Sequence, residues 1–346
     1  MKVNFSFIIQ ALLAALFFGA SAPISKLLLG DVPPVLMAAF LYLGSGTGIS
    51  LIKLYQRLTS NQKEAGIRSP DVKWLAGAII SGGILAPIIL MISLKNTPAS
   101  TASLLLNFEG VGTTVIALFF FRESISRRAL GAIAAITIAS ILLSTNFGSS
   151  WGMSLGAFGV LGACVLWGLD NNLTRNISAK DPLTIVAWKG LVAGSFSLIL
   201  GLVLGQQLPG LITILSILLL GFISYGLSTM LFIYSMRGLG AARTSALYGT
   251  APLAGVLLSI LIFKDPITFL FGIAAVMMVA GALLLANEEH AHFHIHMPVV
   301  HEHRHSHDEF HTHDESDVAH SHEHEHPQME HEHGHMPDIH HRHEDK

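Results

Sequence analysis

Residues 211–235 of this chain are LITILSILLLGFISYGLSTMLFIYS, a run of 25 residues without one charged side chain. The hydrocarbon core of a bilayer is about 30 Å thick, so a helix needs roughly 20 apolar residues to cross it. This run is long and apolar enough, and it is one of ten such runs between residues 5 and 287. The predicted fold is therefore an all-α polytopic membrane protein with ten transmembrane helices.

The ten predicted spans leave short connections, apart from a polar stretch at residues 53–73. By residue number they are 5–29, 35–54, 74–94, 100–121, 129–146, 155–173, 183–204, 211–235, 244–263 and 267–287. The first span is also a candidate secretion signal, because Lys2 precedes it and Ala20-Ser21-Ala22 resembles a cleavage site. Its apolar stretch continues past that site to Leu29, however, and it has a counterpart later in the chain, which favours a membrane span.

Charged residues make up 12% of the 346 residues, whereas soluble domains carry about 25%. They are unevenly divided. Residues 1–287 hold 17 Lys or Arg and 8 Asp or Glu, a net charge of +9, and the tail from residue 288 holds 3 and 15, a net charge of −12 with histidine neutral. The single cysteine, Cys164, excludes an internal disulfide and any multi-cysteine metal site.

The distribution of Lys and Arg predicts the orientation, because short cytoplasmic loops carry the excess of these residues. With the N-terminus inside, the outer side has only Lys95 and Lys264. The inner side has thirteen: Lys2, Lys53, Arg57, Lys63, Arg68, Lys73, Arg122, Arg127, Arg128, Arg175, Lys180, Arg237 and Arg243. We therefore expect a multi-pass protein of the cell membrane with both termini in the cytoplasm.

The two halves of the body are related in sequence. Phe18-Gly19 matches Trp167-Gly168 at an offset of 149, and Phe121-Arg122-Glu123 matches Phe263-Lys264-Asp265 at an offset of 142. Each half contains five spans, and an odd number inserts the halves with opposite orientation, as in transporters that alternate access to a central site. The predicted organisation is a first five-span repeat at 1–147, a second at 148–287 and a tail at 288–346.

Paired motifs in the two halves carry a family resemblance. They are Phe17-Phe18-Gly19 and Leu166-Trp167-Gly168, the run from Ser235 to Arg243, Thr250-Ala251-Pro252, and the endings Phe121-Arg122-Glu123 and Lys264-Asp265-Pro266. Their order and doubled occurrence over residues 5–287 resemble the EamA-like permeases of the drug/metabolite transporter superfamily. The resemblance implies a transporter rather than an enzyme, and transport out of the cell. The chain departs from the family pattern at Phe108-Glu109-Gly110, where proline is usual, which indicates a different substrate site.

Ionisable side chains deep in a span cost at least about 2.5 kcal/mol to insert, so they are candidates for function. Glu109 lies near the middle of the fourth span, too deep for its short side chain to reach water. It is a candidate proton carrier or ligand for an amine, and the alternative is a protonated or paired glutamate that only holds helices together. Lys189 either binds a carboxylate, pairs with Glu109 or Asp170, or extends to the lipid headgroups.

The remaining candidates for the substrate pathway are Asp170, Asn171, Trp167, Tyr248, Thr250 and Pro252. Asp170 and Asn171 form a polar end to the sixth span, for which an ordinary helix-end cluster is the favoured explanation. Pro252 interrupts the ninth span and leaves backbone groups free to face a cavity. Trp167 lines that cavity or, as aromatic residues at this depth more often do, contacts lipid or the core.

The tail contains all 20 histidines, most of them alternating with one other residue. Imidazole binds Zn, Ni and Co, and short His-rich tracts are typical of metal binding. The tail has too few apolar residues to bury a core, so we expect disorder without metal. The alternatives are pH sensing and a solvated tail without a ligand. The predicted metal ligands are His290, His292, His294, His296, His301, His303, His305, His307, His320, His322, His324, His326, His331, His333 and His335.

Three functions compete. The first is a secondary carrier for a small organic solute, such as an amino acid or metabolite, since no phosphate-binding Gly-x-x-x-x-Gly-Lys-Ser/Thr motif is present. The second is a divalent metal transporter whose tail gathers the ion, and the third is a membrane-anchored metal buffer. The expected partners are the bilayer, a small-molecule substrate and metal ions at the tail, with no nucleic acid and no required cofactor. The sequence does not predict the oligomeric state.

Overall fold

The computed structural model describes residues 5–30, 32–59, 64–121, 127–146, 152–177, 180–239, 247–265, 267–286, 290–296, 299–305, 320–326 and 329–335. In the first half these form α1 (Phe5–Gly19), α2 (Ser21–Leu28), α3 (Pro34–Thr59), η1 (Ser69–Asp71), α4 (Val72–Ala78), η2 (Ile79–Leu85), α5 (Ala86–Leu94), α6 (Ala99–Leu105), α7 (Phe108–Phe121) and α8 (Arg127–Ser144). A short antiparallel pair, β1 (Thr145–Asn146) with β2 (Gly152–Met153), separates the two halves.

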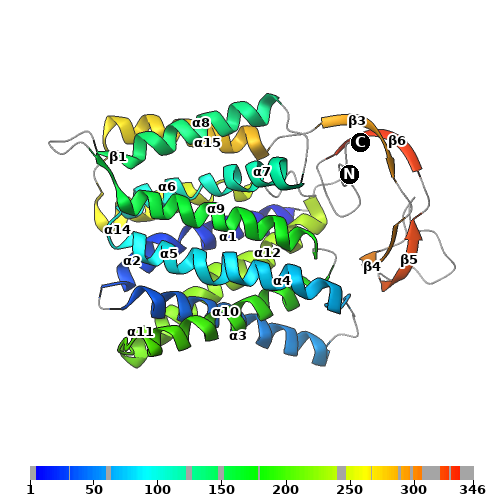
Figure 1. The fold of residues 1–346 in the computed structure, drawn as a ribbon, viewed down its shortest axis with the longest axis horizontal. Coiled ribbons are helices and arrows are strands. Elements are labelled where there is room, and N and C mark those ends of the chain that lie inside the picture. Colours follow the sequence, from blue (N-terminus) through cyan, green and yellow to red (C-terminus); the bar gives the residue numbers. More distant parts are fainter. Residues whose placement is uncertain are drawn as a thin grey trace.

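The second half contains α9 (Leu155–Arg175), α10 (Pro182–Val203), α11 (Leu211–Gly221), η3 (Phe222–Leu227), α12 (Ser228–Leu239), α14 (Ala251–Phe263) and α15 (Phe269–Ala286). Figure 1 shows the helices side by side in one bundle, with α8 and α15 along one edge and α3, α10 and α11 along the opposite edge. The packing corresponds when the halves are exchanged: α7 packs on α9 as α14 packs on α1, and α5 packs on α9 as α12 packs on α1.

Helices occupy all ten predicted span positions in the part of the chain that the structure describes. Six are long and apolar enough to cross a membrane: Ser6–Leu28, Pro34–Thr59, Ser69–Leu94, Ala99–Phe120, Pro182–Val203 and Leu211–Ser235. Three shorter apolar helices lie at Leu130–Leu142, Ala251–Phe263 and Phe269–Gly281. The remaining one, α9, has 21 residues, and its polar end at Asp170, Asn171 and Asn172 lowers its hydropathy. The predicted all-α membrane architecture of the body is confirmed.

Two spans in each half depart from a regular α-helix, and they do so at equivalent places. The third and eighth spans contain the π-helical segments η2 and η3, which begin at Ile79 and Phe222, a spacing of 143 residues. The fourth span is interrupted by a turn at Leu106 and Asn107, and the ninth by a turn at Gly249 and Thr250, the same spacing. Irregular backbone at membrane depth is tolerated only where it is buried in protein or lines a cavity. These segments therefore mark the interior of the bundle.

Four stretches of the tail lie in β-strands. The strand β3 (His290–His296) pairs antiparallel with β6 (Met329–His335), and β4 (Val299–His305) pairs antiparallel with β5 (His320–His326). The physical reason lies in the alternation of histidine with another residue, since a period of two is the period of a β-strand.

Candidate functional site

The interruption of the fourth span places Glu109 at the start of a helix inside the bundle. The α6 helix ends at Leu105, and α7 begins at Phe108, so Glu109 lies in the first turn of α7. Its backbone amide donates a hydrogen bond of 3.1 Å to the carbonyl of Leu106. A helix N-terminus carries a partial positive charge, which favours a carboxylate in its first turn. The broken helix therefore provides a local environment for an acidic side chain that a continuous span lacks.

The side chain of Glu109 has an amide as its hydrogen-bond partner. Asn171 Nδ2 donates to Glu109 Oε1 at 2.9 Å and to Thr113 Oγ1 at 3.2 Å. On the next position of α9, Asn172 Nδ2 donates to the Thr113 carbonyl at 2.9 Å. These bonds join α7 of the first half to α9 of the second. Within the described residues no cation forms an ion pair with Glu109.

The other two charges of the interior neutralise each other. Lys189 on α10 forms an ion pair with Asp170 Oδ2, and Thr174 donates to Asp170 Oδ1 at 3.0 Å. Asp170 is 3% exposed and the Lys189 side chain is 20% exposed, so the carboxylate is shielded from water and the ammonium group largely so. Removing one partner of a buried ion pair is strongly destabilising, because it leaves an uncompensated charge. Asp170 and Lys189 therefore fix α9 against α10, whereas Glu109 remains the acid without a counter-ion in the described interior.

The π-helical segment η2 provides a backbone acceptor beside this group. Tyr42 on α3 and Trp167 on α9 both donate to the carbonyl of Gly82, at 2.6 Å and 3.0 Å. In a π-helical segment the regular backbone hydrogen bonds are displaced, and such segments are frequent at functional sites. The Gly82 carbonyl thus connects the second, third and sixth spans.

A row of aromatic rings continues from Tyr42 into the second half. The ring centroids of Tyr42 and Tyr225 are 5.6 Å apart, those of Tyr225 and Phe18 6.2 Å, those of Phe18 and Tyr248 5.6 Å, and those of Tyr248 and Phe232 4.8 Å. Tyr42, at one end of the row, shares the Gly82 carbonyl with Trp167, which lies one helical turn before Asn171, the hydrogen-bond partner of Glu109. The carboxyl and the aromatic row therefore both connect to this stretch of α9.

The predicted pathway residues divide into three sets. Five of them lie on α9 or bond to it, where α9 packs on α7 and η2: Glu109, Asp170, Asn171, Trp167 and Lys189. Tyr248 joins the aromatic row. Thr250 donates to the carbonyl of Leu247 at 2.7 Å, and Pro252 occupies the first turn of α14. These two residues form the break in the ninth span and make no described hydrogen bond with the Glu109 group.

Sequence reasoning missed Tyr42, Gly82 and Tyr225. Hydropathy along a span does not distinguish a residue that faces the interior from one that faces lipid. One signal was available: Ser81-Gly82-Gly83 and Ser224-Tyr225-Gly226 stand at the same spacing of 143 residues in the two halves. A polar residue and a glycine at matching places in both repeats indicate an interior, closely approached backbone.

The predicted metal ligands of the tail lie on strands β3 to β6, except His307, which is outside the described residues. The backbone register places His290, His292 and His294 opposite His335, His333 and His331. It likewise places His301, His303 and His305 opposite His324, His322 and His320. Among the side chains that the structure describes, no three of His, Cys, Asp or Glu are arranged to hold a metal ion.

Comparisons with known proteins agree with this architecture. Residues 5–145 and 154–287 each match the model of the EamA-like transporter family. An uncharacterized transporter of Methanothermobacter thermautotrophicus is 27% identical over 291 residues, which cover 80% of this chain and 85% of that protein. A solved crystal structure is similar in fold, with a TM-score of 0.58 at 19% identity, and the alignment covers 81% of this chain and 96% of that one.

Proposed function

Because this chain belongs to the EamA-like transporter family and is a transporter rather than an enzyme, we propose that it moves a small organic solute out of the cell. The observation that carries this proposal is Glu109, a carboxyl at the start of a broken helix, bonded to Asn171 one helical turn from Trp167 and so connected to the aromatic row. A carboxyl and aromatic faces together attract a cationic amine, by charge and by cation–π contact. An amino acid or another amine-bearing metabolite fits this chemistry.

The mechanism that we propose is alternating access between two inverted five-span repeats, 1–147 and 148–287. Support comes from the exchange of helix contacts between the halves and from the equivalent positions of η2 and η3. In such carriers the substrate binds near the midplane at discontinuous helices. Glu109 then binds the amine when ionised and releases it when protonated, so a proton is the coupling ion. Asn171 orients the carboxyl through its 2.9 Å hydrogen bond.

A divalent metal transporter is the second candidate, and the His-rich tail is the observation that favours it. Nickel, cobalt and zinc ions require several nitrogen, sulfur or oxygen ligands to replace their water. Residues 1–289 contain no histidine, and of the two acids inside the described spans Asp170 already pairs with Lys189. This ligand set is thin for a metal pathway, so we assign the metal to the tail.

We propose that the tail binds Zn, Ni or Co as a sensor or buffer on the cytoplasmic face of the cell membrane. The alternation of histidine in β3 to β6 and the opposition of histidines in their backbone register support this role. Two neighbouring histidine pairs of such a ladder offer four imidazoles, the number that a tetrahedral zinc site takes.

The test is uptake into proteoliposomes of radiolabelled amino acids and amines, and separately of radiolabelled nickel, cobalt and zinc. The proteins are the full chain, Glu109→Gln and Glu64→Gln, which makes the same change in a loop outside the spans. We expect an amine-bearing solute to accumulate with the full chain and with Glu64→Gln, and Glu109→Gln to lose at least 90% of that uptake, about a tenfold effect.

A fourth protein, truncated after Asn287, separates the tail from the pathway. We expect it to transport the organic solute as the full chain does. If the truncated chain accumulates metal and Glu109→Gln does not, the cargo is a metal ion and the proposal is wrong. If no amine-bearing solute is accumulated by any form, the substrate class is wrong.

A further inference from the structure

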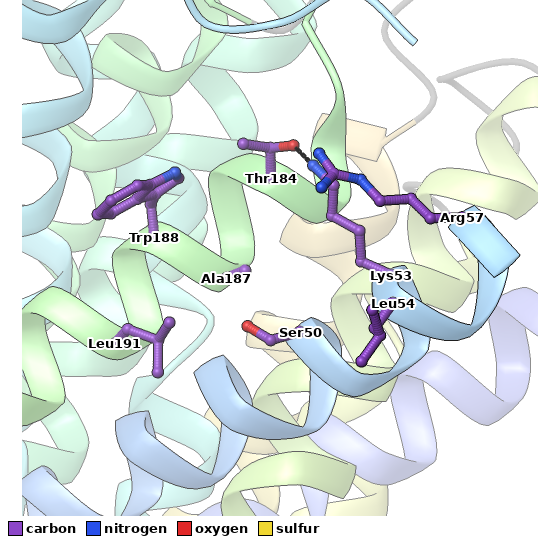
Figure 2. A pocket seen from close by; sticks show the side chains of 8 residues that line it. All are labelled: Ser50, Lys53, Leu54, Arg57, Thr184, Ala187, Trp188 and Leu191. Carbon is purple, nitrogen blue, oxygen red and sulfur yellow. Dashed lines mark hydrogen bonds between the residues drawn. The ribbon is translucent and has the colours of Figure 1, made fainter. Parts of the chain in front are cut away.

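A cavity of about 340 Å³ opens between α3 and α10, apart from the Glu109 group. Lys53, Arg57, Thr184 and Trp188 line it together with apolar residues (Figure 2). Since α3 ends at Thr59 and α10 begins at Pro182, the cavity lies near one end of this helix pair. The pair forms one edge of the bundle (Figure 1). The cavity is therefore at the depth of the lipid headgroups and on the side of the protein that faces lipid.

The cavity carries a net positive charge. Lys53 Nζ lies 2.6 Å from Asp181 Oδ2 and also donates to the Thr184 hydroxyl. An ammonium group has three donors, so one remains for a ligand. Arg57 is exposed, and among the described residues it forms no ion pair. Two cations against one carboxylate leave a site for an anion, and a guanidinium group matches the geometry of phosphate oxygens.

The apolar part of the cavity matches a lipid rather than a soluble anion. Trp188 is 55% exposed and Leu54 is 54% exposed, and both lie on the lipid-facing side of their helices. Tryptophan at the level of the headgroups is typical of residues that anchor a protein in the interface. Leu54 lies beside the cations, and Ala187 and Leu191 continue the apolar lining along α10 away from its start, where an acyl chain would lie.

We propose that this cavity binds the phosphate of an anionic phospholipid, with Lys53 and Arg57 at the phosphate and Trp188 against the glycerol and upper acyl chain. Basic pockets between transmembrane helices bind lipid headgroups in this manner. Asp181 and Thr184 bind the Lys53 ammonium group in the lipid-free protein, so the lipid phosphate competes with the Asp181 carboxylate for Lys53. This inference does not depend on which solute the protein transports.

Native mass spectrometry of the full chain in detergent with equal parts phosphatidylglycerol and phosphatidylcholine tests the proposal. We expect retained phosphatidylglycerol in excess of phosphatidylcholine, and a reduction of that excess by about fivefold in Arg57→Gln, since each cation near a membrane surface contributes about that factor. Lys73→Gln is the matched control, because it removes one exposed charge outside the cavity. Equal loss in both variants would overturn the site.

The Asp181→Asn variant should change the retention of phosphatidylglycerol in the direction opposite to Arg57→Gln. Asparagine keeps the oxygen that accepts the Leu183 amide at 3.0 Å, while the negative charge is removed. We expect this variant to retain more phosphatidylglycerol than the unmodified chain, and no increase would contradict the proposal. Inorganic phosphate added at the concentration of the lipid should not displace it. Displacement would assign the cavity to a free anion instead.

Brominated lipids provide a measurement that does not require a charge change. Brominated phosphatidylglycerol should quench tryptophan fluorescence more than brominated phosphatidylcholine, and Trp188→Phe should remove that difference. If the difference persists in Trp188→Phe, the lipid lies elsewhere and the proposal is wrong.

Discussion

Single glycines decide how closely the two halves approach. A Cβ atom added to Gly168 of α9 would lie 2.6 Å from the carbonyl carbon of Gly112 and from the amide of Thr113 on α7. Real Cβ atoms do not approach backbone so closely, so α7 and α9 must separate in Gly168→Ala. Overpacking of this kind costs about 1–3 kcal/mol. We expect a lower thermal unfolding midpoint for this variant in detergent.

The same helix contains the control. Gly162 on α9 has nothing within 4 Å of an added Cβ, and alanine favours a helix over glycine by up to about 1 kcal/mol. Gly162→Ala should therefore leave the unfolding midpoint unchanged or raise it slightly. If both substitutions lower the midpoint alike, the close approach at Gly168 is not the cause.

The Asp181 carboxyl gives a pH-dependent contribution. Burial raises its pKa, but hydrogen bonds from Lys53 and Thr184, together with the charge of Lys53, outweigh burial, so the pKa lies below the ordinary value of 3.8. An acid with a depressed pKa stabilises the fold above its unfolded-state pKa and loses this contribution as the pH falls through the folded-state pKa. The stabilisation is therefore complete at neutral pH and is lost below 3.8.

The measurement is the difference in unfolding midpoint between the unmodified chain and Asp181→Asn as the pH is lowered. We expect the unmodified chain to be the more stable at neutral pH, and the difference to shrink below 3.8. Asparagine retains the cap on α10, so the cap does not contribute to the change. A difference that is the same at all pH values would contradict the role of the charge.

At this scale the cost of a buried charge predicted Glu109 as a candidate, and the structure places it in the interior. The same reasoning left the partner of Lys189 open between Glu109, Asp170 and the headgroups. The choice of Asp170 depends on how α9 and α10 are rotated against each other, which a single sequence does not contain. Tyr42 was missed because its aromatic ring counts as one more apolar residue of a span. Its hydroxyl donates to the carbonyl of Gly82, which lies in the π-helical segment η2.

At the scale of elements, the length of apolar runs predicted where the helices are but not where they break. A hydropathy average over residues 100–121 is high whether or not the backbone turns at Leu106 and Asn107. The break depends on satisfying the freed backbone groups with residues from other spans. At the other end of α6, Asp265 from the second half satisfies groups in the first turn: its Oδ2 accepts from the amide of Ser100 at 3.0 Å and from its hydroxyl at 2.7 Å.

Asp265 is therefore an N-terminal cap for α6, supplied by the loop between α14 and α15. Removing a cap costs about 1 kcal/mol, so Asp265→Ala should lower the free energy of unfolding by that amount. Asp265→Asn retains an acceptor oxygen and should cost less. Denaturant unfolding followed by circular dichroism measures both. Equal losses in the two variants would indicate that the charge of Asp265, rather than the cap, is what matters.

At the scale of the whole molecule, the distribution of Lys and Arg in the body predicts on which side of the membrane the acidic tail lies. Thirteen of the fifteen loop cations fall on one predicted side, and an even number of spans puts the tail on that same side. The chain is suited to cysteine labelling, because Cys164 is buried and 0% exposed. An added cysteine therefore reacts with a membrane-impermeant maleimide against a low background.

Two added cysteines decide the orientation. Gln207 is exposed in the connection between α10 and α11, which the cation count places outside, and Ser316 lies in the tail. We expect Gln207→Cys to be labelled in intact cells and Ser316→Cys to be labelled only after the membrane is permeabilised. The reverse pattern would invert the protein and place the histidines outside the cell, where they would no longer sense cytoplasmic metal. Labelling of both in intact cells would mean an even number of crossings between residues 207 and 316, against the three complete spans that the helices α11 to α15 provide.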